Sequence, residues 1–482
     1  MSIEGSSQMS NAFNARMDRR TFLRGISASA AGASLMSALG PIGAQAANVG
    51  GYKAIVCLFL KGGVDGHDLL LPYDQASYNR YADIRRTFMD ADSGLADGPQ
   101  RSRSALLELS PLNAASFGSR SFALPPSLGG IHSLFSAGRA SIMANVGPLR
   151  TPINATQYRE NPGLRPKKLF SHNDQQSTWM ALETEGVRFG WGGRFADAAV
   201  VSNANAQPAF SAMTFTGNEV FLSGEFVSQY KASAKGAEDF REIVSRRFRN
   251  AAQGDPAVEA ALVEHYSRSA DAPSNLFARD VASVAQRAYT ANAAFEDAIE
   301  TTPDFATTFP NSGLGGQLGA VARTIAARGS LGASRQVFMV AKGGYDTHGS
   351  QATSLPGLHA DVDASVTAFF AALQEIGVEN DVLLFTASDF GRTLTLNGSG
   401  TDHGWGNHHL IVGGSIDGGK IFGEVPPYDL DHEYDTGRGR IIPTTSVEQF
   451  AAPMGRWFGL SESELATALP NLSAFSSPPV FV

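Results

Sequence analysis

The sequence predicts an α/β protein built on a mainly parallel β-sheet, and three observations support this. Short apolar runs end in glycine-rich loops, as expected for strands buried on both faces of a sheet. An amphipathic helix separates two of these runs, giving the strand, loop, helix and strand order of a βαβ unit. The 482 residues are 43% hydrophobic and 17% charged, which is typical of a globular chain rather than a disordered one.

Five segments are predicted as strands. The first, residues 52–60, is apolar apart from Lys53 and ends at Lys61-Gly62-Gly63. The other four are residues 140–146, 336–341, 381–387 and 409–413.

The predicted helices differ along the chain. Residues 358–375 carry an apolar stripe that includes Val362, Val366 and Phe369, and this helix should end near Gly377. Residues 228–300 are rich in Ala, Arg and Glu, which predicts a helical insertion within a single domain spanning 47–482. The polar stretch 90–103 is predicted to be an exposed loop.

Charge and cysteine content exclude several classes of protein. The net charge is −8, without a basic tract, which argues against nucleic acid or an anionic membrane as the main partner. A single cysteine, Cys57, excludes an intramolecular disulfide framework and a cysteine-based zinc cluster. No stretch is long and apolar enough to be a typical transmembrane helix.

The first 46 residues have the pattern of an export signal. A charged segment around Arg19-Arg20 precedes an Ala/Ser-rich apolar run, and Ala44-Gln45-Ala46 follows as a cleavage pattern. The arginine pair followed by Thr-Phe-Leu resembles the twin-arginine signal of bacteria. We therefore expect export by the twin-arginine translocase, a periplasmic or extracellular location and no stable membrane anchor.

Asp and His residues gather in the loops that follow the predicted strands. In an open α/β sheet, ligands bind where the carboxyl ends of the strands deliver their loops. Imidazole and carboxylate together favour zinc or manganese, with iron or calcium as further possibilities, in one or two divalent sites. The candidate metal ligands are Asp65, Asp346, His348, Asp389, Asp402, His403 and His408. The same residue types also form turns and helix caps, and that alternative remains open.

Residues 169–179 contribute a further polar segment. Ser171 beside His172 is a candidate nucleophile or part of an oxyanion site. Arg392 or His172 could stabilise anionic oxygens, and water is the alternative nucleophile. The candidate catalytic residues are therefore Ser171, His172 and Arg392.

Taken together, these motifs resemble the bacterial family known as domain of unknown function 1501. The resemblance rests on the leader and on motifs spread over almost the whole mature chain. These motifs are residues 59–66, Ser171-His172, Tyr345-Asp346-Thr347-His348, 388–393 and 400–406. The family looks related to the alkaline phosphatase and sulfatase superfamily. That relation implies a mostly parallel sheet sandwiched between helices and hydrolysis of phosphate or sulfate esters with divalent metals.

The superfamily pattern is matched residue by residue only in part. Asp65 matches a metal-binding Asp after the first strand, and Asp346 with His348 matches a later Asp followed by His. Phe390 stands where a metal-binding His is usual, and no sulfatase nucleophile motif surrounds Cys57.

Two functions follow from this resemblance. The first is an exported metal-dependent hydrolase of small-molecule or polymer-borne phosphate or sulfate esters. The alternative is a non-catalytic, metal-stabilised envelope binding or assembly protein on the same fold.

Overall fold

The structure is a computed structural model, and it describes residues 50–237, 261, 264–265 and 276–482. These residues belong to one unit of the chain, 47–482. The predicted export signal lies outside the described residues.

Within the described residues, the central sheet has ten strands in the order β14-β5-β13-β10-β1-β9-β6-β7-β8, with β15 paired to β5. The strands are β1 (Lys53–Leu60), β5 (Ala140–Gly147), β6 (Ala212–Thr214), β7 (Tyr230–Ser233), β8 (Gly236–Ala237), β9 (Arg335–Lys342), β10 (Val382–Ser388), β13 (Asn407–Gly413), β14 (Ile421–Phe422) and β15 (Thr445–Ser446).

Most neighbouring strands of this sheet are parallel. β1 pairs in parallel with both β9 and β10, and β6 pairs in parallel with β9 and β7. β13 runs antiparallel to β10 and β5, and β8 runs antiparallel to β7. The carboxyl ends of β1, β5, β9 and β10 therefore meet at one edge of the sheet.

Side chains of β1 explain why the sheet needs helices on both faces. Val56 and Leu58 belong to one buried cluster, whereas Cys57 and Phe59 belong to another. Because successive side chains of a strand point to opposite faces, a strand this apolar is stable only when both faces are covered.

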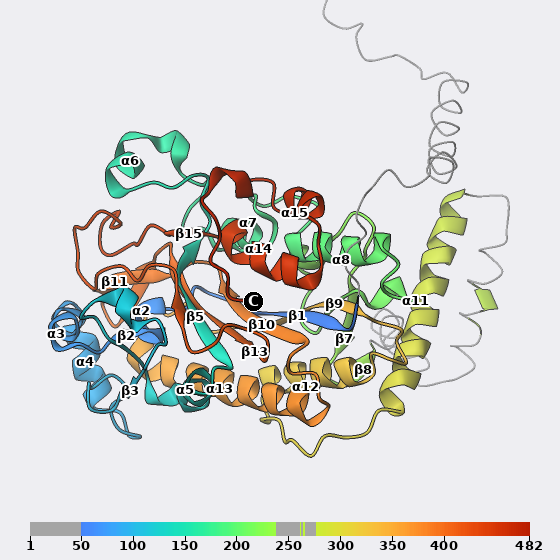
Figure 1. The fold of residues 1–482 in the computed structure, drawn as a ribbon, viewed down its shortest axis with the longest axis horizontal. Coiled ribbons are helices and arrows are strands. Elements are labelled where there is room, and N and C mark those ends of the chain that lie inside the picture. The colour runs from blue at the N-terminus through green and yellow to red at the C-terminus, as the bar shows by residue number, and fades with distance from the viewer. Residues whose placement is uncertain (1–49, 238–260, 262–263, 266–275) are drawn as a thin grey trace, which may run out of the picture. The chain divides into compact units, whose positions relative to one another are not determined.

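Two helical layers cover the faces (Figure 1). The first packs Ile131, Leu318 and Val366 into the cluster that contains Val56. The second packs Trp179 and Phe450 into the cluster that contains Phe59. The first layer consists of α5 (Gly129–Ser136), α12 (Gly313–Ala326) and α13 (Gln351–Glu375). The second consists of α7 (His172–Ala181), α8 (Trp191–Val201), α14 (Val447–Phe458) and α15 (Glu462–Ala468).

Further helices and strands lie outside the central sheet and these two layers. One is a two-stranded hairpin, and another is a three-stranded sheet in the order β2-β4-β3. They are α2 (Gly66–Leu69), β2 (Leu71–Pro72), α3 (Gln75–Ile84), α4 (Arg86–Ser93), β3 (Leu107–Glu108), β4 (Phe122–Leu124), α6 (Ala155–Glu160), α11 (Leu276–Glu300) and the hairpin strands β11 (Arg392–Asn397) and β12 (Gly400–His403).

The predicted fold class, a mostly parallel sheet between helices, is confirmed. All five predicted strands are present, each within two residues of its predicted bounds. The predicted helix 358–375 begins earlier, at Gln351, and continues through Pro356.

Two local predictions differ from the structure. The predicted helical insertion 228–300 begins with strands β7 and β8, and its described carboxyl-terminal part is α11; most of the stretch between them lies outside the described residues. Residues 90–103 are not simply an exposed loop, because Asp92 and Arg101 are buried and form an ion pair of 2.7 Å. Among the described helices, none has the length and apolar character needed to cross a membrane.

Candidate metal centre

Side chains from three separate segments meet at the carboxyl edge of the sheet. Asp346 follows β9, His172 is the first residue of α7, and His403 is the last residue of β12. One ligand atom from each of these three residues lies within 4.8 Å of the other two. His348, two residues after Asp346, also reaches the group.

The shortest distances converge on the Oδ1 atom of Asp346. The Nε2 atoms of His172, His403 and His348 lie 3.5, 3.4 and 3.1 Å from it. The Nε2 atoms of His348 and His403 are 2.9 Å apart. The structure therefore brings together three of the predicted metal ligands, and adds His172, which the sequence had indicated as catalytic.

Hydrogen bonds on the far side of two rings define where their lone pairs point. His172 Nδ1 lies 2.6 Å from Asp389 Oδ2, and His403 Nδ1 lies 2.8 Å from the carbonyl of Phe170. A carboxylate and a carbonyl only accept, so both Nδ1 atoms must carry the proton. In each neutral ring the Nε2 lone pair then faces Asp346.

This donor set fits a divalent metal ion. When both rings are neutral, each Nε2 lone pair lies 3.4–3.5 Å from Oδ1 of Asp346. Ligands of a tetrahedral zinc at about 2.0 Å would lie roughly 3.3 Å apart. Ligand histidines in metal sites usually donate their second ring N–H to a carboxylate or a carbonyl, as both do here.

Electrostatics hold Asp346 ionised. Burial raises the pKa of its carboxyl, but the hydrogen bond and charge of Arg392 outweigh burial and lower it. The hydrogen bond to Asp389 raises the pKa of His172, whereas burial lowers that of His403.

Arg392 bonds to Asp346 and to backbone carbonyls of the site rather than to a ligand. Its side chain is fully buried, and its Nη2 lies 2.5 Å from Asp346 Oδ1. The guanidinium also donates to the carbonyls of Gly62, Gly63 and Thr401. Its predicted direct contact with a substrate anion is therefore not available in this structure, and its observed contacts are those of a positioning residue.

Gly62 allows two of the site loops to approach each other. Its φ of +112° lies in the region that favours glycine, and an added Cβ would lie 2.4 Å from the backbone nitrogen of Asp346. Its own N–H donates to Asp389 Oδ1 at 3.1 Å. The glycine-rich loop after β1 therefore acts through its backbone.

Asp65 does not reach the group. Its carboxylate is fully buried and accepts two hydrogen bonds from Arg85, at 2.6 and 3.1 Å. Gln351 Nε2 donates to it at 2.6 Å. Burial raises the pKa of Asp65, but the charge and hydrogen bonds of Arg85 outweigh burial and lower it. The oxygens predicted to bind metal are thus taken by protein donors.

His408 does not reach the group either. Its Nδ1 accepts the backbone N–H of Asn145 at 3.0 Å, so the proton of the neutral ring sits on Nε2. Burial lowers its pKa to about 3, so the ring is neutral, and it faces His67 with ring centroids 6.5 Å apart. In this tautomer neither nitrogen offers a free lone pair to a metal.

Asp389 and Asp402 lie next to histidines of the group but are not among its facing atoms. Asp389 is buried and accepts from Gly62, His172 and Gln176, so it orients His172 rather than competing with it. Asp402 is held by Arg438 at 2.5 Å, and its Oδ1 lies 3.8 Å from Nδ1 of His348.

Comparison with known proteins identifies the family. The family described as "Protein of unknown function (DUF1501)" matches residues 52–469, which include every candidate site residue. The chain belongs to this family. Among curated proteins, no sequence matches it.

Several solved structures resemble this DUF1501 member. They include Ps i-CgsB in complex with k-i-k-neocarrahexaose, with 10% identity over 89% of this chain and 77% of that chain and a TM-score of 0.34. Ps i-CgsB alone shows 9% identity over the same shares, with a TM-score of 0.31. A mutant of the alkaline phosphatase PafA shows 11% identity over 71% and 63% of the two chains, with a TM-score of 0.24. With such TM-scores, these similarities say nothing about the activity of this chain.

Ser171 caps α7, directly before His172, but its hydroxyl turns elsewhere. Its Oγ donates to Asp174 Oδ2 at 2.9 Å, and no contact in the described part of the chain joins it to Asp346 or His403. The predicted nucleophile is therefore engaged away from the metal group in this DUF1501 member.

Two functional features of the site were missed from the sequence. One is Arg85, which neutralises Asp65 from 20 residues further along the chain. The other is the hairpin of β11 and β12, which carries His403. Alternating Thr and Leu before Asn397-Gly398 is a hairpin signal that would have predicted it.

Proposed function

We propose that this DUF1501 member is an exported, metal-dependent hydrolase of phosphate or sulfate esters. The observation that carries the proposal is the convergence of His172, Asp346 and His403, with the Nδ1 atom of each histidine bonded to an acceptor. Zinc or manganese fits this mixed nitrogen and oxygen donor set best. The leader at Arg19-Arg20 supports passage through the twin-arginine translocase to the periplasm or beyond.

A single ion agrees best with the available donors. Asp65 and Asp389 both accept hydrogen bonds from protein groups on each of their oxygens. Removing either from these partners would leave buried donors unsatisfied, which costs free energy. A second cation could therefore bind neither Asp65 nor Asp389 without that cost.

The residues around the group have distinct tasks in this proposal. When bound, the metal would polarise an ester oxygen and lower the pKa of a water. Asp389 and the Phe170 carbonyl keep the two Nε2 lone pairs aimed at one point. Arg392 holds Asp346 in place and ionised.

Of the three histidines in the group, His348 is the best placed to contact a substrate. Its side chain is 44% exposed, whereas that of His403 is 22% exposed. It can serve as a further ligand or as a hydrogen-bond donor to the ester. Because Ser171 Oγ is bonded to Asp174, water is the nucleophile that this geometry favours.

The alternative is a metal-stabilised envelope binding or assembly protein without catalysis. Phe390 favours it, because the ring fills the space beside the group, with centroids 4.9 Å from His172 and 4.4 Å from His403. Among the residues that the structure describes, no nucleophilic side chain lies beside the metal group, and this also favours the binding protein.

Turnover separates the two functions. The protein exported through its own leader would be stripped with a chelator, reloaded with zinc or manganese, and assayed on 4-nitrophenyl phosphate and 4-nitrophenyl sulfate. We expect reloading to restore hydrolysis in the wild type and in the control His132→Ala, which removes a half-buried histidine bonded to the Glu108 carbonyl, but not in His403→Ala. Bound metal without turnover of either ester would favour the binding protein. A protein that retains no divalent metal under any loading condition would exclude both metal-dependent functions.

A further inference from the structure

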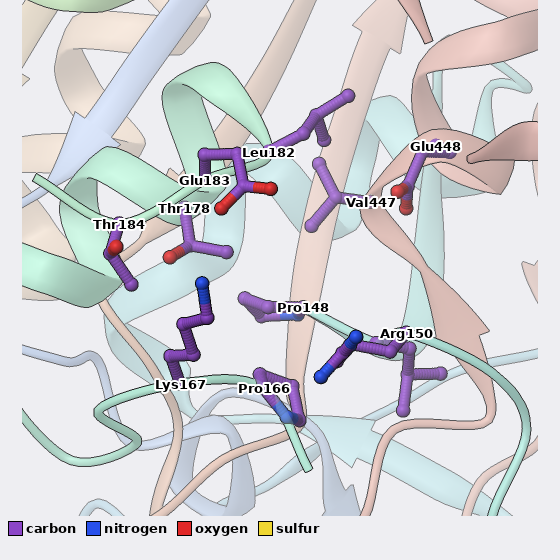
Figure 2. Close-up of a pocket in the computed structure, with 11 residues that line it drawn as sticks. Pro148, Arg150, Pro166, Lys167, Thr178, Leu182, Glu183, Thr184, Val447 and Glu448 are labelled. Atoms are coloured by element: carbon purple, nitrogen blue, oxygen red, sulfur yellow. The ribbon is translucent and has the colours of Figure 1, made fainter. Parts of the chain in front are cut away.

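A surface cavity of about 100 Å³ opens near the carboxyl end of α7, the helix whose first residue is His172. Four segments line it: the loop after β5, the loop before α7, the carboxyl-terminal part of α7 with the residues that follow it, and the first turn of α14. Figure 2 shows Lys167 and Glu183 extending into this space from opposite sides, with Thr178 between them. The cavity therefore presents charged and hydroxyl groups to one ligand volume.

One continuous segment of chain contacts both this cavity and the metal group. Pro166 and Lys167 line the cavity, and the carbonyl of Phe170 accepts from His403. His172 belongs to the metal group, and Thr178 lines the cavity again. His172 and Thr178 are about 9 Å apart along the helix axis, given a rise of about 1.5 Å per residue. At about 100° per residue, the two side chains lie about 120° apart around the axis, so a chain-like ligand that reaches both places must curve around the helix.

The loop between β5 and α7 is basic within an acidic protein. Residues 148–170 contain five Lys or Arg side chains and one acid, Glu160, whereas the whole chain has a net charge of −8. Among the described residues, Lys167 and Arg150 make no ion pair, although Arg150 donates to the carbonyl of Gly163. The loop as a whole therefore attracts anionic ligands, while the cavity lining combines Lys167 and Arg150 with Glu183 and Glu448.

The other residues that line the cavity indicate which class of anionic ligand would fit. Pro148 and Leu182 supply apolar surface, which suits the C–H faces of a sugar ring. Glu183 and Glu448 supply acceptors for hydroxyl groups. Among the residues that the structure describes, no aromatic side chain lines the cavity, although stacking on aromatic rings is the usual way to hold the bases of a single-stranded nucleic acid.

We infer that this cavity is a subsite for an anionic polysaccharide, with Lys167 and Arg150 pairing with its sulfate or phosphate groups. Its assignment to an ester-cleaving site rests on the proposed function, in which a neighbouring ester of the same polymer reaches the metal group. The substrate class is then a polymer that carries several esters, rather than a small monoester.

Binding to metal-free protein tests this subsite separately from catalysis. Dextran sulfate, unsulfated dextran and a single-stranded oligonucleotide would be titrated into chelator-treated protein, and their Kd values compared. The test variant is Arg150→Gln with Lys167→Gln. The matched control is Arg80→Gln with Arg86→Gln, which removes the same charge from exposed arginines of α3 and α4.

We expect dextran sulfate to bind the wild type and the control with Kd values within about twofold, and the test variant about tenfold more weakly. Unsulfated dextran should not bind. Equal weakening in both variants, no binding of dextran sulfate, or equally tight binding of the oligonucleotide would overturn the inference. Intact binding without metal-dependent turnover would refute the proposed function and leave the subsite standing.

Discussion

Two groups of Asp and His side chains lie at the ends of neighbouring strands, and they differ in what their polar atoms are free to do. In the metal group, Nε2 of His172 and Nε2 of His403 face Asp346 with their lone pairs. The buried group comprises Asp65 and His408. In it, Arg85 donates hydrogen bonds to both oxygens of Asp65. Among the described residues, Arg392 bonds only Oδ1 of Asp346, whereas Arg85 takes both oxygens of Asp65. An acid after a strand is thus a ligand candidate only where a neighbouring guanidinium leaves one of its oxygens available, and sequence position alone does not decide this.

The largest expected effect comes from removing the guanidinium that pairs with Asp65. Arg85→Met leaves Asp65 buried without its partner, and we expect a loss of about 3–5 kcal/mol in the free energy of unfolding. Urea unfolding of the whole chain measures it.

The control for this variant is Arg86→Met. Arg86 is the next residue, with a side chain that is 72% exposed, and its loss should cost no more than about 0.5 kcal/mol. Equal stabilities for the two variants would show that Arg85 is not what keeps Asp65 buried.

Acid pH should separate buried histidines from exposed ones. His359 is buried, neither ring nitrogen has a partner among the described residues, and burial lowers its pKa to about 4. The charged groups acting on it are Asp68, Arg101 and Asp65. Since the folded pKa lies below the unfolded value, stability should fall as pH drops from about 6.5 to about 4, by at most about 3 kcal/mol for this residue.

The measurement is the free energy of unfolding from pH 7 to pH 4. In His359→Leu the profile should be flatter than in the wild type, and His132→Leu, at a half-buried position on α5, is the control for loss of a histidine. A steeper decline in His359→Leu would have the wrong sign for this account.

The residues that orient the metal group should matter less for folding than for metal affinity. Asp389→Asn replaces the acceptor of His172 Nδ1–H with an amide, which can offer an N–H to the same atom. We expect metal affinity to fall about 10–100-fold. Competition with a chelator measures this fall, and Asp417→Asn, at an exposed acid, serves as the control. Unchanged affinity would mean that Asp389 does not orient the ring.

The smallest expected effect comes from a pair of matched glycines. Gly62→Ala places a side chain at a φ of +112° and against the backbone of Asp346, which should cost at least about 1 kcal/mol and weaken metal binding. Gly343, in the equivalent Lys-Gly-Gly motif after β9, has open space for a Cβ, so Gly343→Ala should be nearly neutral. Thermal unfolding and metal titration compare them, and equal effects would show that the approach of the two loops is not constrained.

Much of the fold could be predicted from the sequence because it follows from local patterns. The strand 52–60 and the helix ending near Gly377 are encoded by apolar runs and stripes. The placing of Asp and His after strands predicted the edge where the site lies.

The identity of the ligands could not be predicted in the same way. Whether Asp65 or Asp346 is available depends on contacts between residues far apart in sequence, such as Gln351 with Asp65. Side chains alternate along a strand, so of two adjacent histidines, such as His408 and His409, only one can face the site. That rule separates the two faces of the strand but does not reveal which ring nitrogen carries the proton.

The most direct test of the central claim is a count of bound metal on three proteins by elemental analysis after loading and desalting. One equivalent in the wild type, one in His408→Gln and none in Asp346→Asn is the predicted result, with circular dichroism showing that all three are folded. Two equivalents in the wild type, or loss of metal from His408→Gln, would contradict the account, because the buried group would then bind metal as well.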